Sequence, residues 1–180
     1  MRFAVGDFME NKKCLFVGFK GMKNSSGVLV SELLKEFPPR EDGVLKNFCL
    51  LTNSFERVKK DIEAIEGNYD FVIMFGCDKS LKDCVRLERS AGKDGVKCET
   101  RLDVKLLSET LSRDGVENVI SETPTHYLCN EAYWYALQKF DGKAVFIHIP
   151  TLKNIDENFI SKMKELKKHG ILDGTFKSSR

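Results

Sequence analysis

Short apolar runs alternate along this chain with segments of helical periodicity, and this alternation constrains the fold more than any other feature. The clearest run, residues 70–76 (DFVIMFG), is apolar at consecutive positions, which is typical of a strand buried on both faces. Further strands are predicted over 13–18, 44–51, 85–91, 118–121 and 143–148. Strands that alternate with helices predict the α/β class, as a three-layer α/β/α sandwich with a largely parallel central sheet.

The helices between these strands carry recognisable start and stop signals. Asn53 is predicted to cap a helix because Glu56 follows three residues later, and Asp103 is predicted to cap another. Gly115 and Gly170 are predicted to end helices, since glycine adopts the conformation that follows a last turn. The predicted helices cover 26–37, the segment after Asn53, 103–113, 129–137 and 154–169.

Composition excludes several classes of function. With 180 residues, the chain is predicted to form one domain over 1–180, with residues 1–11 as an N-terminal extension of it. Its 29 basic and 27 acidic residues give a net charge of +2, which offers no electrostatic case for nucleic acid or membrane binding. No apolar run approaches the roughly 18 residues of a membrane-spanning helix, and the first residues lack the apolar core of a secretory signal.

Cysteine and histidine usage indicates a reducing compartment without a metal site. The six cysteines form no C-x-x-C pair, so we expect reduced thiols and a cytoplasmic location. The three histidines lack the clustered spacing of zinc ligands. We expect neither a metal nor another cofactor.

Cys129 is the candidate nucleophile. It heads an apolar helix (CNEAYWYAL), and His148 ends the strand 143–148. A helix N-terminus and a neighbouring imidazolium both lower the pKa of a thiol, so we expect a thiolate–imidazolium pair between Cys129 and His148. Alternatively, Cys129 is a small buried hydrophobic residue and His148 a hydrogen-bonded core histidine. His126, three residues before Cys129, is a rival base.

Glu88 is the candidate third member, which would orient the imidazole and stabilise its charge. If its segment is extended, Cys84, Arg86 and Glu88 share one face because strand side chains alternate. The alternative is a surface ion pair of Glu88 with Arg86 or Arg89. Together, the three candidates point to a cysteine hydrolase.

These pieces occur in the order found in a known peptidase family. The segments LFVGF (15–19), NSS (24–26), LERSA (87–91), YLCN (127–130) and FIHIP (146–150) resemble the pyroglutamyl peptidase I (pyrrolidone-carboxylate peptidase) family. Thr52 follows the second strand where the family has Pro-Thr. The family's Glu–Cys–His triad carries over to Glu88, Cys129 and His148.

The resemblance implies a thiol protease of the omega-peptidase type. Such an enzyme hydrolyses N-terminal pyroglutamate (5-oxoproline) from peptides through a thioester acyl-enzyme, and its partners are those peptides. By correspondence, Phe19, Met22, Tyr127 and Leu128 would form the walls of the substrate pocket, with Asn24 and Thr52 as polar positions nearby. The resemblance also implies a homo-oligomer.

The chain departs from the family pattern at several places, among them the lost proline of Asn-Pro-Ser and Met22 in place of the aromatic residue after Gly-Phe. Pro124-Thr125-His126 replaces Ala-Gly-Thr, residues 76–82 replace a glycine-rich loop, and the segment between Glu88 and Cys129 is short. Two alternatives therefore accompany the peptidase hypothesis. One is a catalytically impaired homologue that binds pyroglutamyl groups, and the other is a related cysteine amidohydrolase that acts on another small lactam or amide.

Overall fold

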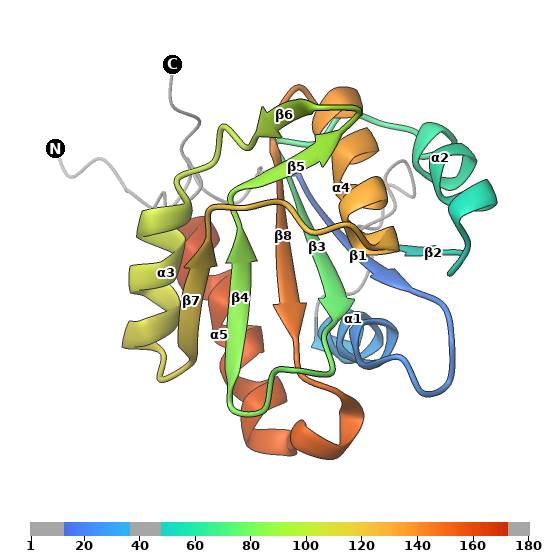
Figure 1. Cartoon of the computed structure of the whole chain (residues 1–180). Coiled ribbons are helices and arrows are strands. Elements are labelled where there is room, and N and C mark those ends of the chain that lie inside the picture. The colour runs from blue at the N-terminus through green and yellow to red at the C-terminus, as the bar shows by residue number, and fades with distance from the viewer. Residues whose placement is uncertain (1–12, 37–47, 173–180) are drawn as a thin grey trace, which may run out of the picture.

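A six-stranded sheet forms the centre of the protein. The computed structural model describes residues 13–36 and 48–172. The strands of its large sheet follow the order β2-β1-β3-β8-β4-β7, and every neighbouring pair is parallel except β4 with β8. These strands are β1 (Cys14–Phe19), β2 (Phe48–Leu51), β3 (Phe71–Cys77), β4 (Cys84–Glu88), β7 (Glu117–Ser121) and β8 (Ala144–Ile149) (Figure 1). The predicted, largely parallel sheet is confirmed.

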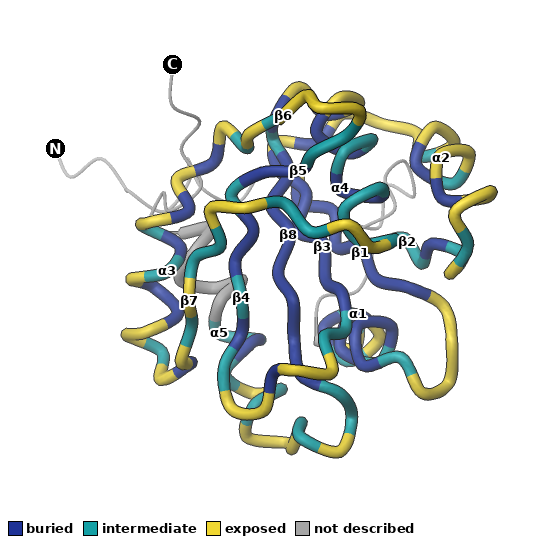
Figure 2. Tube along the Cα trace, viewed as in Figure 1, coloured by how far each residue is buried: buried dark blue, intermediate teal, exposed yellow. Residues whose placement is uncertain are grey.

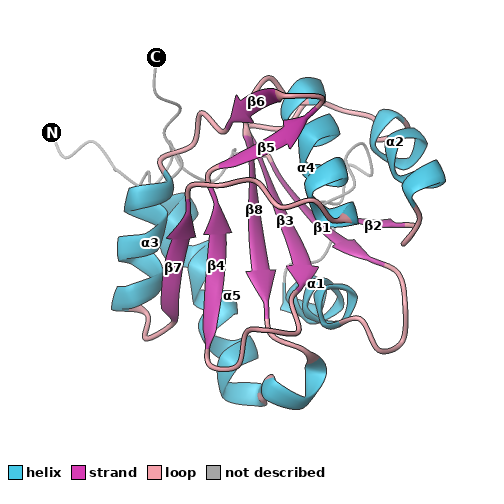
Figure 3. Ribbon diagram, viewed as in Figure 1, coloured by secondary structure: helices cyan, strands magenta, loops and turns pink. Residues whose placement is uncertain are grey.

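Helices cover both faces of this sheet. One face packs against α1 (Ser25–Glu36), α3 (Val104–Arg113) and α5 (Glu157–Leu172), and the other packs against α2 (Phe55–Glu63) and α4 (Leu128–Lys139) (Figure 3). A short 3-10 helix, Leu152–Asn154, precedes α5. The α/β class and the three-layer architecture are confirmed.

The strand pleat divides the core into two clusters. Ile73 and Phe75 of β3 belong to the cluster under α1, α3 and α5, whereas Val72 and Met74 belong to the cluster under α2 and α4. Side chains of a strand alternate between the faces of a sheet, so a strand buried on both faces is apolar throughout. Figure 2 shows this as continuous dark blue along the central strands.

A small antiparallel hairpin lies outside the main sheet. Its strands are β5 (Ser90–Lys93) and β6 (Val96–Glu99), and β5 packs along α4. Asn130 of α4 joins the two elements, because its Oδ1 accepts from Gly92 N at 2.9 Å and its Nδ2 donates to Gly92 O at 2.7 Å. This amide pairing fixes the start of α4, where Cys129 lies, against the chain that follows β4.

Several predicted boundaries were wrong. The N-cap of α2 is Ser54 rather than Asn53, because the amides of Arg57 and Val58 bond to the carbonyl of Ser54. The segment 85–91 is two strands in two sheets, since the chain leaves β4 at Arg89, whose amide bonds to Ser121 O. The helix α5 continues past Gly170, which costs a helix only about 1 kcal/mol.

Other predictions hold or lie outside the described residues. Asp103 caps α3 by accepting from Leu106 N at 2.9 Å, and Gly115 follows that helix with φ +76°. The predicted extension over 1–11 and the first residues of the predicted strand 44–51 lie outside the described residues. In the part of the chain that the structure describes, no helix combines the length and apolarity needed to cross a membrane.

Candidate active site

The antiparallel pair β4–β8 brings the candidate catalytic side chains together. His148 of β8 lies opposite Arg86 of β4, and Glu88 lies opposite Phe146. Residues two apart on a strand share a face, so all four side chains point to the face that α4 covers. On the other side of His148, its register partner on β3 is Gly76.

Glu88 and His148 form a buried hydrogen bond. His148 Nδ1 lies 2.7 Å from Glu88 Oε1, and His148 and Glu88 are only 4% and 3% exposed, respectively. The hydroxyl of Tyr133 donates to the backbone carbonyl of Glu88 at 3.0 Å, which fixes the end of β4 against α4. The second carboxylate oxygen, Glu88 Oε2, is buried and has no hydrogen-bond partner.

The Glu88 carboxyl is charged in this arrangement. Burial alone would raise its pKa, but hydrogen bonds from His148 and Arg86 outweigh burial and hold the pKa of Glu88 below its usual value. A carboxylate is only an acceptor, so His148 Nδ1 carries the proton. In a neutral imidazole, the other ring nitrogen, Nε2, is then free to accept a proton.

Cys129 is the second residue of α4 and lies directly above Gly76. A Cβ at position 76 would stand 2.8 Å from Cys129 Sγ and 2.6 Å from the ring of Phe146. Such separations are closer than real Cβ contacts, so only glycine leaves room for the thiol here. The thiol thus rests on the sheet beside His148, the register partner of Gly76.

A small hollow joins these groups, and we call it the Cys129 hollow. It is lined by Glu88, Ser90, Thr125, Cys129, Asn130, Tyr133, Phe146 and His148. Its volume is about 160 Å³ with its open mouth included. The hydroxyl of Ser90, like Glu88 Oε2, is buried there without a hydrogen-bond partner.

The expected low pKa of Cys129 was wrong. Burial, together with the nearby acidic groups of Cys77, Asp78 and Glu88, raises the pKa of the Cys129 thiol to about 12. Among the described residues, no hydrogen bond joins Cys129 Sγ to His148, although both line the hollow. The free site therefore holds Cys129 as a protonated thiol at neutral pH rather than as a preformed thiolate.

The structure distinguishes between the alternatives for the base and the carboxylate. The side chain of His126 is exposed and does not line the Cys129 hollow, whereas His148 does. Arg89 pairs with Glu122 instead of Glu88, with Nε 2.9 Å from Oε2. Arg86 does bond to Glu88, but at a buried carboxylate that binds His148 at the same time.

The six predicted substrate-binding residues do not gather in the Cys129 hollow. Phe19 ends β1 and is buried, with its ring centroid 6.5 Å from that of Phe146, and Leu128 packs half-buried beside Cys129. Met22 and Tyr127 are 95% and 75% exposed.

The two polar positions already have partners within the protein. Asn24 Oδ1 accepts from Ser26 N at 3.0 Å and from Ser26 Oγ at 2.7 Å. The backbone amide of Thr52 donates to Asp61 Oδ2 at 2.6 Å. Binding of substrate by these six residues stays a prediction.

Sequence reasoning missed four residues that shape the site: Gly76, Ser90, Asn130 and Tyr133. Only Gly76 carried a signal, as a glycine that ends an apolar strand. The described part of the chain contains no group of three or more His, Cys, Asp or Glu side chains placed to hold a metal ion.

The structure thus places a thiol, an imidazole and a carboxylate at one end of α4 on an α/β/α sandwich. No protein-family model matches the chain, and no curated protein sequence matches it. Its structure, in contrast, resembles several solved structures over most of its length.

Several of the similar structures are peptidases of one kind. The pyroglutamyl peptidase I from Bacillus amyloliquefaciens superimposes with a TM-score of 0.68 at 18% identity, over 91% of this chain and 95% of that one. The pyrrolidone carboxyl peptidase from Thermus thermophilus gives 0.65 at 19% identity, over 84% and 96%. The enzyme from Thermococcus litoralis gives 0.63 at 22% identity, over 90% and 94%. The chain therefore has the pyroglutamyl peptidase fold, as the sequence resemblance implied.

Proposed function

We propose that this protein is a cysteine peptidase that removes N-terminal pyroglutamate from peptides. The observation that carries the proposal is the 2.7 Å bond from His148 to Glu88 in the hollow that also contains Cys129. This constellation occurs on a fold shared with proteins named pyroglutamyl peptidase I and pyrrolidone carboxyl peptidase. The sequence resemblance assigns the same three residues to the family's triad.

In the proposed reaction, Cys129 attacks the carbonyl that joins pyroglutamate to the next residue. His148 Nε2 takes the thiol proton as the S–C bond forms, and then gives it to the departing amine as the C–N bond breaks. Glu88 holds the imidazole and stabilises the imidazolium. Water then attacks the thioester with His148 again as base, which releases pyroglutamate and restores the thiol.

General-base activation suits a thiol with a raised pKa. A thiol of pKa about 12 is protonated at neutral pH, so the proton must leave during the attack. In substrate-free sites, catalytic hydrogen bonds are often long and shorten only when substrate binds. The missing Cys129–His148 hydrogen bond is compatible with this route.

The start of α4 supplies donors for the developing oxyanion. The first amides of a helix have no acceptor within the helix, and the side chain of the N-cap residue, Tyr127, makes no capping hydrogen bond. The amides of Leu128 and Cys129 are the ones we assign to the oxyanion. A lactam ring carries no charge, so its pocket requires apolar walls, such as Phe19 and Leu128, with few polar groups.

Tyr127 and Met22 must move if they contact the substrate as predicted. Both are exposed, and the Cys129 hollow is small. We expect them to close over the pyroglutamyl ring when a peptide binds. A cytoplasmic location and a homo-oligomeric state remain further predictions.

A second candidate function is binding without turnover. The observations that favour it are the raised pKa of Cys129 and the narrow hollow above it. A third candidate function is hydrolysis of another small lactam or amide. Asn24 and Thr52 make hydrogen bonds within the protein, so no polar group is yet identified that would select the pyroglutamyl ring over other acyl groups.

Hydrolysis of a pyroglutamyl-coumarin amide separates the three. The peptidase proposal predicts turnover by the wild type, loss of turnover in Cys129→Ser, and unchanged turnover in Cys98→Ser, a matched variant on β6. Binding of a pyroglutamyl peptide without turnover would establish the binding protein instead. Turnover of other acyl amides, with the pyroglutamyl substrate left intact, would establish the amidohydrolase.

A further inference from the structure

Arg86 contacts the carboxylate of Glu88 from the same strand. The two residues are two apart on β4, so the pleat directs both to the face under α4. Arg86 Nε donates to Glu88 Oε1 at 2.8 Å, the same oxygen that accepts from His148 at 2.7 Å. Oε1 therefore receives two donors while Oε2 receives none.

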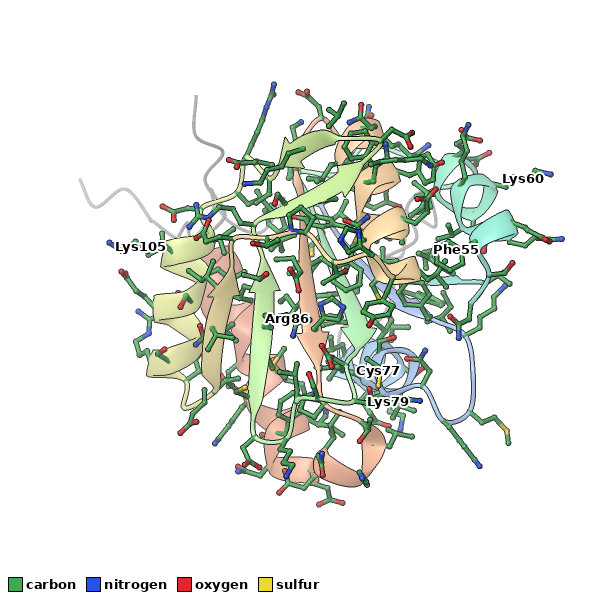
Figure 4. All side chains as sticks on the ribbon, in the orientation of Figure 1. Phe55, Lys60, Cys77, Lys79, Arg86 and Lys105 are labelled. Carbon is green, nitrogen blue, oxygen red and sulfur yellow. The ribbon has the colours of Figure 1, made fainter. Side chains whose placement is uncertain are left out.

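The other end of the guanidinium is held by the loop that follows β3. Arg86 Nη2 lies 2.7 Å from Asp78 Oδ2. Asp78 is itself fixed, because its Oδ1 accepts from Ser80 N at 2.8 Å and from Ser80 Oγ at 2.6 Å. The planar group thus spans two carboxylates on two segments, and Figure 4 labels Arg86 on the sheet near β4 and β8.

The charges around this cluster favour a fixed arrangement. Burial lowers the pKa of Arg86, but Glu88 and Asp78 outweigh burial and raise it above its usual value. Burial would raise the pKa of Asp78, but bonds from Ser80 and Arg86 lower it. The side chains of Arg86 and Asp78 are only 22% and 20% exposed, so solvent screens them weakly.

We propose that Arg86 is a positioning residue, which, anchored by Asp78, sets the orientation of Glu88 toward His148. The inference rests on the proposed function for its effect on catalysis, although the geometry can be tested without any substrate. Nothing in the reaction requires Arg86 to touch the peptide.

Arginine suits this role better than lysine. Its planar fork donates in fixed directions, so Nε and Nη2 can bond to Glu88 and Asp78 simultaneously. A lysine supplies the charge at one point and cannot reproduce both bonds. Arg86→Lys therefore separates orientation from charge.

The titration of Glu88 is the readout that does not need activity. The groups that face the Glu88–His148 pair are Arg86 from β4, Cys129 and Tyr133 from α4, and Cys77 and Asp78 from the end of β3 and its loop. Arg86 is the group among them whose positive charge is permanent, and it lowers the pKa of Glu88. Its removal should raise that pKa.

The test combines carbon NMR of labelled glutamate with kinetics on the folded full-length chain. In Arg86→Gln, the titration midpoint of Glu88 should rise by about one pH unit, and kcat should fall about tenfold or more. In Arg86→Lys, the midpoint should stay close to the wild type while kcat remains reduced. Asp78→Asn should lower kcat in the same way, and the control Arg101→Gln, which breaks an exposed pair with Asp141, should change neither.

The outcomes distinguish this inference from the proposed function. A Glu88 midpoint and a kcat that are unchanged in Arg86→Gln and Arg86→Lys would overturn the positioning role even if the wild type is an active peptidase. If Arg86→Gln shifts the titration midpoint of Glu88 but the wild type has no peptidase activity, the positioning role is supported and the peptidase proposal is refuted. Should Arg86→Gln fail to fold, Arg86→Lys and Asp78→Asn carry the test.

Discussion

His148 donates from its Nδ1 to Glu88 Oε1 at 2.7 Å, although 60 positions separate the two residues in the sequence. The bond arises from the antiparallel register of β4 and β8. Glu88 pairs with Phe146 across the two strands, and His148, two residues after Phe146, points to the same face of the sheet. β4–β8 is the antiparallel pair in an otherwise parallel sheet. The topology of the sheet thus builds the pair that we assign to catalysis.

Replacement of Glu88 by glutamine should reduce kcat while the protein stays folded. An amide cannot stabilise the imidazolium that forms during the attack, so we expect a loss on the order of 10²–10⁴-fold. Steady-state hydrolysis of a pyroglutamyl-coumarin amide measures it. The control Glu63→Gln, in an exposed pair on α2, should retain full activity. Equal activity in both variants would remove Glu88 from the mechanism.

Substitution of Gly76 by alanine should displace the thiol. The new methyl would lie 2.8 Å from Cys129 Sγ and 2.6 Å from the ring of Phe146. Overpacking of this kind costs about 1–3 kcal/mol of unfolding free energy. We expect a lower midpoint in urea unfolding together with a loss of kcat. Gly95→Ala is the control. Gly95 lies in the β5–β6 turn with open space around it, but its φ of +78° disfavours alanine, so this variant should lose stability without displacing the thiol. Its kcat should not change.

Alkylation of Cys129 should be slow at neutral pH in the free protein. Its thiol has a pKa of about 12, so the thiolate fraction rises about tenfold per pH unit through neutral and mildly alkaline pH. Iodoacetamide labelling followed by peptide mass spectrometry gives the rate at Cys129 apart from the other cysteines. A rate that is high and independent of pH down to about pH 6 would reveal a preformed thiolate–imidazolium pair instead.

Acid should destabilise the protein partly through Glu88. Its pKa in the folded state lies below the value of 4.5 expected for a free side chain, so the carboxylate stabilises the fold above that pH. This contribution is lost as pH falls through the lower, folded-state pKa. Urea unfolding between about pH 6 and about pH 3 should show a shallower loss in Glu88→Gln than in the wild type. The pKa of Asp78 is also lowered in the folded state, so the stability of Glu88→Gln should still fall somewhat as the pH decreases. Parallel pH profiles would contradict the linkage.

The sequence was sufficient for the parts of the fold that depend on continuous apolar patterns. β3 and β8 are buried on both faces, and their apolar runs identified them directly. The β5–β6 hairpin escaped notice because its residues are mostly polar or small, and because the side chain of Asn130, which lies far along the chain, joins it to α4. Local patterns contain no information about that distant contact.

The candidate triad was found through residue types and family resemblance, but its environment was not. The pKa of Cys129 depends on its burial and on the acidic groups of Cys77, Asp78 and Glu88, which periodicity does not reveal. Arg86 was weighed only as a surface partner of Glu88. The register of β4 against β8 brings His148 to the same buried carboxylate oxygen of Glu88 that Arg86 contacts.

The central claim is that Cys129 forms a thioester with the pyroglutamyl group, and a rapid acid quench during turnover of an activated pyroglutamyl ester tests it most directly. Acid stops deacylation, and mass spectrometry of the intact and digested protein then locates the acyl group. The account predicts a mass increase of one pyroglutamyl group, confined to the peptide that contains Cys129 and absent in Cys129→Ala. An acyl group on another cysteine, or turnover by Cys129→Ala at the wild-type rate, would contradict it.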